Sequence, residues 1–405
     1  MVPSAPAILV ARNALAAGDP LRALSLIGRL DGAHGLLLRG IAYAQLGDLE
    51  LAYESLAAAE AQAEAPHARA RARAALVEIA LNGGDPAPAA RNARACAEEL
   101  AQLGDARNAA MLRLVMARAE VLLGRLGEAR HVVEEVLATE LPPDIVALAC
   151  LAQAEIAVRA LAAGEARSAL TRARRGLEGA PHPLLERALA ALERELLVPI
   201  ARILRAGAPR DADLFAIEDV SRGQVLLVDA CRKLALSGRA AIPLARRPVL
   251  FGLLLVLGRA WPAAVARRDL ATQAFGAHRV NESHLARLRV EIGRLRKLMD
   301  GLSAEPIASG DGYVLSSKRD VVVLLPLTDE DSARVGFLLA DGASWSARGL
   351  AEHAGISKRT AQRALAALVA SGSVVRAGKG NGVRYARLGG TVASRMLLLG
   401  LLPTR

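Results

Sequence analysis

Apolar residues in the first 200 positions recur at the spacing of amphipathic helices, and a glycine interrupts the pattern every 29 to 40 residues. An alanine follows each of these glycines five residues later. We predict that each glycine ends a helix in the left-handed conformation and that each alanine lets the next helix pack closely. Asp19, Asp48 and Asp85, each directly after a glycine, are suitable N-caps. The pairs are Gly18 and Ala23, Gly47 and Ala52, Gly84 and Ala89, Gly124 and Ala129, and Gly164 and Ala169.

The pattern changes after residue 200. Residues 201–222 are predicted to form a connecting helix and linker, because Gly207, Pro209 and Asp211 interrupt any regular element. The spacing shifts towards two residues over 224–244, which predicts a β-hairpin with its turn at Ser237 and Gly238. Helical spacing returns at 247–257, 267–275 and 281–299, and a second hairpin is predicted over 306–316.

The segment 281–299 has two distinct faces. One apolar stripe at helical spacing is predicted to face a core, and it consists of Leu285, Leu288, Ile292, Leu295 and Met299. A different face is predicted to carry His284, Arg287, Glu291 and Arg294. An amphipathic helix with this many arginines can enter the major groove of DNA, although an arginine-rich solvated surface is the alternative interpretation.

Residues 346–371 have the spacing of a helix-turn-helix, and a basic hairpin is predicted at 374–385. Ala351 lets two helices cross closely, Gly355 suits the turn, and Ala361 and Leu365 point inward. Ser357 is a good N-cap for the second helix. The polar residues that follow Ser357 are then expected on or near the outer face of that helix.

The charge of the chain is unevenly distributed. The net charge is +11, but residues 1–200 hold 21 Lys and Arg against 24 Asp and Glu, whereas residues 201–405 hold 31 against 17. This segregation predicts a nearly neutral sensing or docking part joined to a part that binds a polyanion. Because aromatic residues make up only 2% of the chain, the helical core is expected to consist mainly of alanine and leucine.

Three regions resemble known families. The glycine–alanine repeat resembles a divergent tetratricopeptide-type array of helical hairpins, and a generic α–α superhelix is the alternative. The segments ARRDLATQAFG (266–276), RVEIGRLRKLM (289–299) and GDGYVL (310–315) together resemble the OmpR/PhoB-type winged-helix domain. They correspond to its second helix, its recognition helix and its wing. Residues 346–371 resemble winged helices of the MarR, GntR and IclR type.

These resemblances imply double-stranded DNA as a partner, with recognition helices at 281–299 and 357–371 in major grooves. They imply wings near 310–313 and 377–384 on the flanking backbone. The segment NESHLA and Glu291 depart from the family pattern, and Glu291 would place a negative charge near the DNA. The expected DNA-binding residues are His284, Arg287, Arg289, Arg294, Lys297, Ser357, Lys358, Arg359, Gln362, Arg363, Arg376, Lys379 and Arg384.

Signals of catalysis and cofactor binding are weak. The seven histidines are scattered, and the three cysteines, Cys96, Cys150 and Cys231, lack the spacing of a metal site. Gly378-Lys379 lacks the glycine and the Ser or Thr of a phosphate-binding loop. We therefore expect no enzyme activity, no metal and no cofactor. Trp261 and Trp345 are expected to anchor cores, with stacking on bases as the alternative.

The sequence thus predicts a mainly α chain, in which a helical-hairpin solenoid precedes two small α+β winged-helix domains. The expected parts are the repeats at 1–200, a linker at 201–222, winged helices at 223–326 and 327–390, and an apolar tail at 391–405. We expect a cytoplasmic, sequence-specific transcriptional regulator with no membrane segment. The repeats would bind a protein or peptide partner in their groove, sense a ligand, or form a homodimer. A protein-interaction scaffold and a non-specific DNA organiser are the alternatives.

Overall fold

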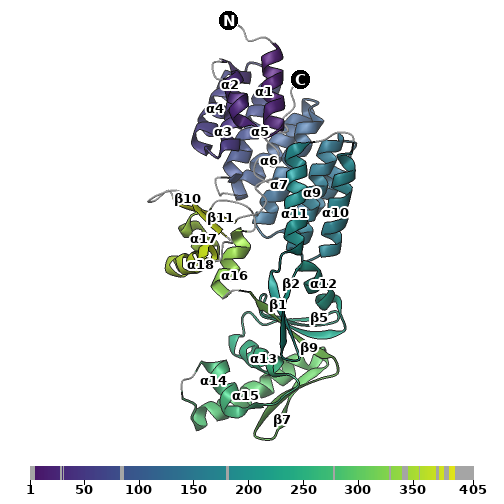
Figure 1. The fold of residues 1–405 in the computed structure, drawn as a ribbon, viewed down its shortest axis with the longest axis vertical. Helices are drawn as coiled ribbons and strands as arrows, with labels where there is room; N and C mark the ends of the chain where they lie inside the picture. The colour runs from purple at the N-terminus through teal and green to yellow at the C-terminus, as the bar shows by residue number, and fades with distance from the viewer. Residues whose placement is uncertain are drawn as a thin grey trace. The chain divides into compact units, whose positions relative to one another are not determined.

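The computed structural model describes residues 5–27, 30, 32–82, 86–178, 182–276, 279–327, 330–339, 345–354, 356–370, 374–377 and 383–387. It divides into two compact units, Met1–Glu195 with Arg334–Arg405, and Leu196–Ala333. The described residues are mainly helical, and their strands lie after residue 200 (Figure 1), which confirms the predicted mainly α class. No helix of the described part is long and apolar enough to cross a membrane.

The N-terminal helices pack as consecutive neighbours along the chain. Their interfaces are made of small side chains, because Ala23, Ala52, Ala89, Ala129 and Ala169 are all buried, as the repeat predicted. These helices are α1 (Ala5–Ala16), α2 (Pro20–Ile27), α3 (Ala33–Leu46), α4 (Leu49–Gln62), α5 (Pro66–Asn82), α6 (Pro86–Gln102), α7 (Ala106–Leu122), α8 (Leu126–Leu137), α9 (Pro143–Arg159), α10 (Ala163–Gly176) and α11 (Pro183–Leu197).

The glycines of the repeat follow the prediction at three positions. Gly18, Gly47 and Gly124 have φ angles of 75°, 85° and 77° between successive helices. The prediction was wrong for Gly164, which lies inside α10, while Leu161 takes the positive φ of 58° between α9 and α10. Gly104, with φ of 78°, separates α6 from α7 and was missed. Gly84 and Asp85 lie outside the described residues.

The predicted connecting helix and linker at 201–222 is wrong in its first part, whereas a helix is present in its second part. Its first part forms the hairpin β1 (Ala201–Arg205) and β2 (Ala208–Ala212), followed by α12 (Leu214–Arg222). Strand β1 also pairs with β9 (Asp320–Pro326), which is more than a hundred residues away in sequence. Pro209 and Asp211 are tolerated because β2 is an edge strand, where a proline needs no ladder partner.

Strands β1 and β2 belong to a six-stranded mixed sheet with the order β2-β1-β9-β3-β4-β5. The remaining strands are β3 (Val225–Asp229), β4 (Leu234–Ser237) and β5 (Ala240–Pro243). Strands β3 and β9 run parallel, and the other pairs are antiparallel. The turn between β4 and β5 begins at Gly238 with φ of 61°, as the sequence predicted.

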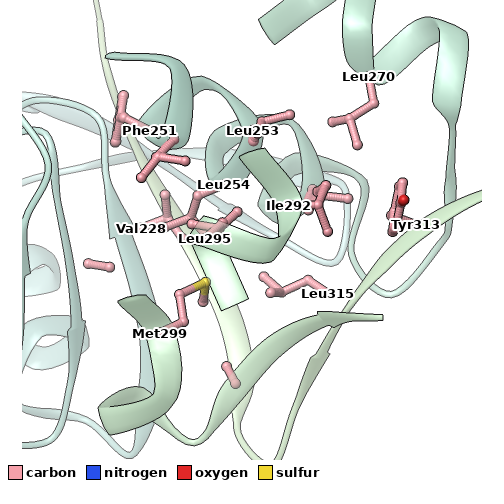
Figure 2. Packing of buried hydrophobic residues seen from close by; sticks show 14 of the residues in the cluster. Val228, Phe251, Leu253, Leu254, Leu270, Ile292, Leu295, Met299, Tyr313 and Leu315 are labelled. Atoms are coloured by element: carbon pink, nitrogen blue, oxygen red, sulfur yellow. The ribbon is translucent and has the colours of Figure 1, made fainter. Parts of the chain in front are cut away.

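Of the next three helices, one packs against this sheet and the other two pack on that helix, and a small second sheet adjoins them. The helices are α13 (Pro248–Ala260), α14 (Arg267–Phe275) and α15 (Glu282–Met299), and a short 3-10 turn, Asp300–Leu302, ends α15. The second sheet has the order β6-β8-β7, formed by β6 (Val265–Ala266), β7 (Ala304–Ser309) and β8 (Gly312–Ser317). Leu254, Leu270, Ile292 and Leu315 meet in one shared core (Figure 2).

The last described elements form a separate small core. They are α16 (Glu330–Leu339), α17 (Ala347–Ala354), α18 (Lys358–Ala370), β10 (Val374–Ala377) and β11 (Arg384–Arg387). Val335, Leu350 and Leu365 pack together in this core, and Trp345 packs against it. Trp345 also exchanges two 2.8 Å backbone hydrogen bonds with Tyr385 of β11. Trp261 packs against the larger core, so both tryptophans contact cores as expected.

Candidate nucleic-acid interface

Helix α18 separates its apolar and basic residues onto opposite faces. Its first turn is capped by Ser357, whose Oγ accepts a hydrogen bond from the Thr360 N–H at 3.0 Å. Ala361, Ala364, Leu365 and Leu368 are buried on the inner face. The predicted DNA-binding residues of the helix and its cap are exposed, namely Ser357, Lys358, Arg359, Gln362 and Arg363. Because α18 contains no Asp or Glu, its exposed face is positively charged.

The hairpin after α18 adds further cations. Strands β10 and β11 pair antiparallel, with Arg376 opposite Tyr385 and Ala377 opposite Arg384. Both predicted arginines of this hairpin, Arg376 and Arg384, are exposed. Lys379 lies outside the described residues, as does Gly355 in the turn between α17 and α18.

In α15, the predicted role of His284 differs from what the structure shows. Its backbone N–H donates to the Asn281 side-chain oxygen at 3.1 Å, and its ring Nδ1 lies 2.6 Å from that same oxygen. The ring is also half-buried, with its centroid 6.3 Å from that of Phe275. His284 is therefore part of the helix cap. The missed signal was its position three residues after Asn281, which is the spacing of a capping box.

Glu291 also differs from the expectation. It is buried, and its carboxylate accepts a 2.9 Å hydrogen bond from the exposed Arg294 guanidinium. Its position beside Ile292 and three residues after Leu288 places it at the border of the core-facing stripe. The negative charge expected near the DNA is therefore turned inward and paired, whereas the predicted apolar stripe itself is buried from Leu288 to Met299.

The remaining predicted cations of α15 are exposed. The Arg287 guanidinium lies over the Phe275 ring of α14, 4.8 Å from its centroid. This stacking orients the charged group while leaving it at the surface. Arg289, Arg294 and Lys297 are exposed along the rest of the helix. The structure thus places four of the five predicted α15 residues at the surface.

A cavity of about 550 Å³ lies between the start of α13 and α15. Arg247, Arg294 and Lys297 all line this cavity, and Glu291 also lines it. Sequence reasoning missed Arg247. The available signal was the pair Arg246-Arg247 directly before Pro248, the first residue of a helix, but only the packing of α13 on α15 places it beside the recognition-helix candidate.

The predicted wing at 310–313 forms the turn between β7 and β8 and carries a negative charge. Asp311 is exposed at its tip. Glu305, on β7, lies 3.2 Å from the Arg296 guanidinium of α15. The Arg267 guanidinium lies 5.9 Å from the centre of the Tyr313 ring on β8. This hairpin is therefore less suited to phosphate contact than the basic hairpin β10–β11.

Other chemically reactive groups do not gather in the described part of the chain. No group of three or more His, Cys, Asp or Glu residues there could hold a metal ion. All three cysteines are free. Burial raises the pKa of the Cys96 thiol to about 11, so Cys96 is not a reactive thiolate at neutral pH, whereas Cys231 is exposed.

Comparison with known proteins does not assign the chain to a family. The chain matches no protein-family model, and no curated protein is similar enough in sequence to be matched to it.

Proposed function

We propose that this chain is a sequence-specific DNA-binding transcriptional regulator. In this proposal, α13–α15 with β6–β8 form an OmpR/PhoB-like winged helix, and α16–α18 with β10–β11 form a second winged helix of the MarR, GntR or IclR type. The N-terminal helices act as a tetratricopeptide-like module that binds a partner, senses a ligand or forms a dimer.

The observation that carries the proposal is the outer face of α18. Lys358, Arg359, Gln362 and Arg363 are exposed side by side on the second helix of a helix-turn-helix, and no carboxylate of that helix opposes them. Arginine can donate two hydrogen bonds to guanine O6 and N7, and glutamine can pair with adenine. Cations that are not used on bases can contact phosphates.

Helix α15 supports the same proposal in the other unit. It buries one face in the core and exposes Arg287, Arg289, Arg294 and Lys297. Arg247 at the start of α13 lies beside this row and can contact the flanking phosphate backbone. Because Glu291 is buried and its charge is paired with Arg294, its repulsion of DNA is reduced.

Three ion pairs in the N-terminal helices join residues at a similar separation in sequence, which supports the proposed helical-hairpin repeat. Arg71 donates to Asp105 at 2.8 Å, and Arg107 and Arg130 pair with Asp144 and Glu165. The partners in each pair are 34 to 37 residues apart, about one helical hairpin. Stacked hairpins of this kind present an extended surface to protein or peptide partners.

The test is selection from randomised duplex DNA by the full chain at about 150 mM salt, followed by sequencing of the bound pool. We expect enrichment of a defined motif. Binding without enrichment would favour a non-specific DNA organiser, and absence of binding would favour a protein-interaction scaffold. Either outcome would overturn the proposed function.

A further inference from the structure

The exposed face of α15 has an apolar centre between its cations. An α-helix turns about 100° per residue, so Val290 lies about 200° from Leu288, which is fully buried. Val290 therefore points away from the core, and 54% of its surface is exposed. A β-branched apolar residue is an unfavourable choice at an exposed mid-helix position, since it lowers helix propensity and leaves more than half of its surface in water.

Charged residues surround this valine on the same helix. Arg287 and Arg294 lie one turn before and one turn after it, Arg289 is adjacent, and Lys297 continues the face two turns on. An ordinary protein partner of a cationic rim would need carboxylates, whereas the DNA major groove offers phosphates at its edges and an apolar group at its floor. That apolar group is the C5-methyl of thymine, the one base substituent in the groove that a valine can contact favourably.

We propose that Val290 is a specificity-determining residue that recognises a thymine methyl group, while the surrounding cations position α15 in the groove. The inference rests on the proposed function, because it requires α15 to enter a major groove. It assigns to Val290 a base preference that the cationic residues do not supply. It also predicts at least one A·T base pair within the part of the selected site that α15 covers.

Small residues on either side of Val290 would let the backbone of α15 come close enough to DNA for the valine to contact a thymine methyl group. Ala286 and Gly293, which lie four residues before and three residues after Val290, have small side chains or none. A Cβ at Gly293 would meet no atom of the described residues within 4 Å, so the space beside Val290 is open among them. At these two positions no long side chain separates the helix from the groove floor, while the arginines at the other neighbouring positions can turn towards the phosphates.

The experiment replaces each thymine of the selected site by deoxyuridine, which removes only the C5-methyl group. Binding of the full chain and of Val290→Ala is measured by fluorescence polarisation. We expect one or more uridine substitutions to weaken wild-type binding about fourfold, the value for one apolar carbon removed from contact. Val290→Ala should bind the thymine site more weakly and should show no further loss with uridine at that position.

Arg289→Ala is the matched control, because it removes a neighbouring exposed side chain from the same helix. It should weaken thymine and uridine duplexes by the same factor. A sequence-specific protein with no uridine-sensitive position, or with equal sensitivity in Val290→Ala, would overturn this inference and leave the proposed function intact. A chain that binds no duplex would overturn both.

Discussion

Gly293 lies in the middle of α15, where glycine is less favourable than alanine by about 1 kcal/mol. The described residues do not explain this choice, since a Cβ at Gly293 would meet none of their atoms within 4 Å. Close approach of a ligand to the backbone is one reason to keep glycine in such a position. Under the proposed function, Gly293 would let DNA approach the backbone of α15 beside Val290.

Gly293→Ala should stabilise the protein by about 0.5–1 kcal/mol and weaken DNA binding at the same time. Thermal unfolding and polarisation titrations on the same samples measure both effects. Gly127→Ala, at an exposed helical glycine in α8 that is equally open, is the control and should leave DNA affinity unchanged. Unchanged affinity in Gly293→Ala would mean that DNA does not approach this part of α15.

Arg359→Ala or Arg363→Ala should reduce sequence preference, by about 1–3 kcal/mol at the base pair that the side chain contacts. Repeating the selection with each variant measures this directly. Arg348→Ala provides the comparison, because Arg348 is also exposed but lies on α17, 2.9 Å from Glu352. An unchanged motif in all three variants would contradict the proposed orientation of α18.

Glu78 in α5 is 3% exposed, and burial raises the pKa of its carboxyl group to about 8, against the smaller opposing effect of Arg118. In the unfolded chain the group titrates near 4.5. Its contribution to stability is therefore fully present below pH 4.5 and is lost as pH rises towards 8. Glu78→Gln keeps the size of the side chain but removes the charge.

The variant should match the wild type in stability at pH 5 and exceed it at pH 8 by about 1–4 kcal/mol. Urea denaturation followed by circular dichroism at the two pH values measures the difference. A gain that is equal at both pH values would show that Glu78 does not titrate in this range.

At the scale of elements, helix caps join the N-terminal helices to one another. The Asp105 carboxylate accepts from the Asn108 N–H at 3.2 Å, from the Asn108 side chain at 2.7 Å and from Arg71 of α5 at 2.8 Å. Burial acts to raise its pKa, but these hydrogen bonds and the Arg71 charge outweigh burial and lower it. Asp48, in contrast, caps α4 at the surface through the Leu51 N–H alone among the described contacts.

Asp105→Ala should cost about 2–4 kcal/mol, because it removes a cap together with the buried hydrogen bonds that the carboxylate accepts from Arg71 and Asn108. Asp48→Ala should cost about 1 kcal/mol, the value of an exposed cap alone. Chemical denaturation of the two variants provides the measurement. Equal losses would show that the Arg71–Asp105 pair does not stabilise the packing of α5 on α7.

Most single elements could be predicted because their signals are local. Helix α14 has the predicted bounds 267–275, and the predicted turn at Gly238 is present, since spacing and turn residues act over a few positions. The candidate site was predicted only in part. The periodicity identified α15 and its buried stripe. Glu291 lies at the border of that stripe, so the spacing of apolar residues does not decide whether its carboxylate is at the surface or buried and paired.

At the scale of the whole molecule, the proposal requires two DNA-binding units in one chain. A hydroxyl-radical footprint on the selected site should then contain two protected segments. Replacing Arg359 and Arg363 together should remove one segment, and replacing Arg289 and Lys297 together should remove the other. Loss of the same segment in both double variants would show that only one unit contacts DNA.

The sequence by itself determined the mainly α character, the close alanine packing of the N-terminal helices and the helix-hairpin order of both basic parts. These features depend on periodicity, caps and glycine positions within a few residues of each other. Tertiary structure alone decided that 201–212 forms strands, because β1 needs β9 as its partner across more than a hundred residues. It also decided the burial of Glu78 and Glu291 and the place of Arg247 beside α15, since exposure depends on which elements pack together.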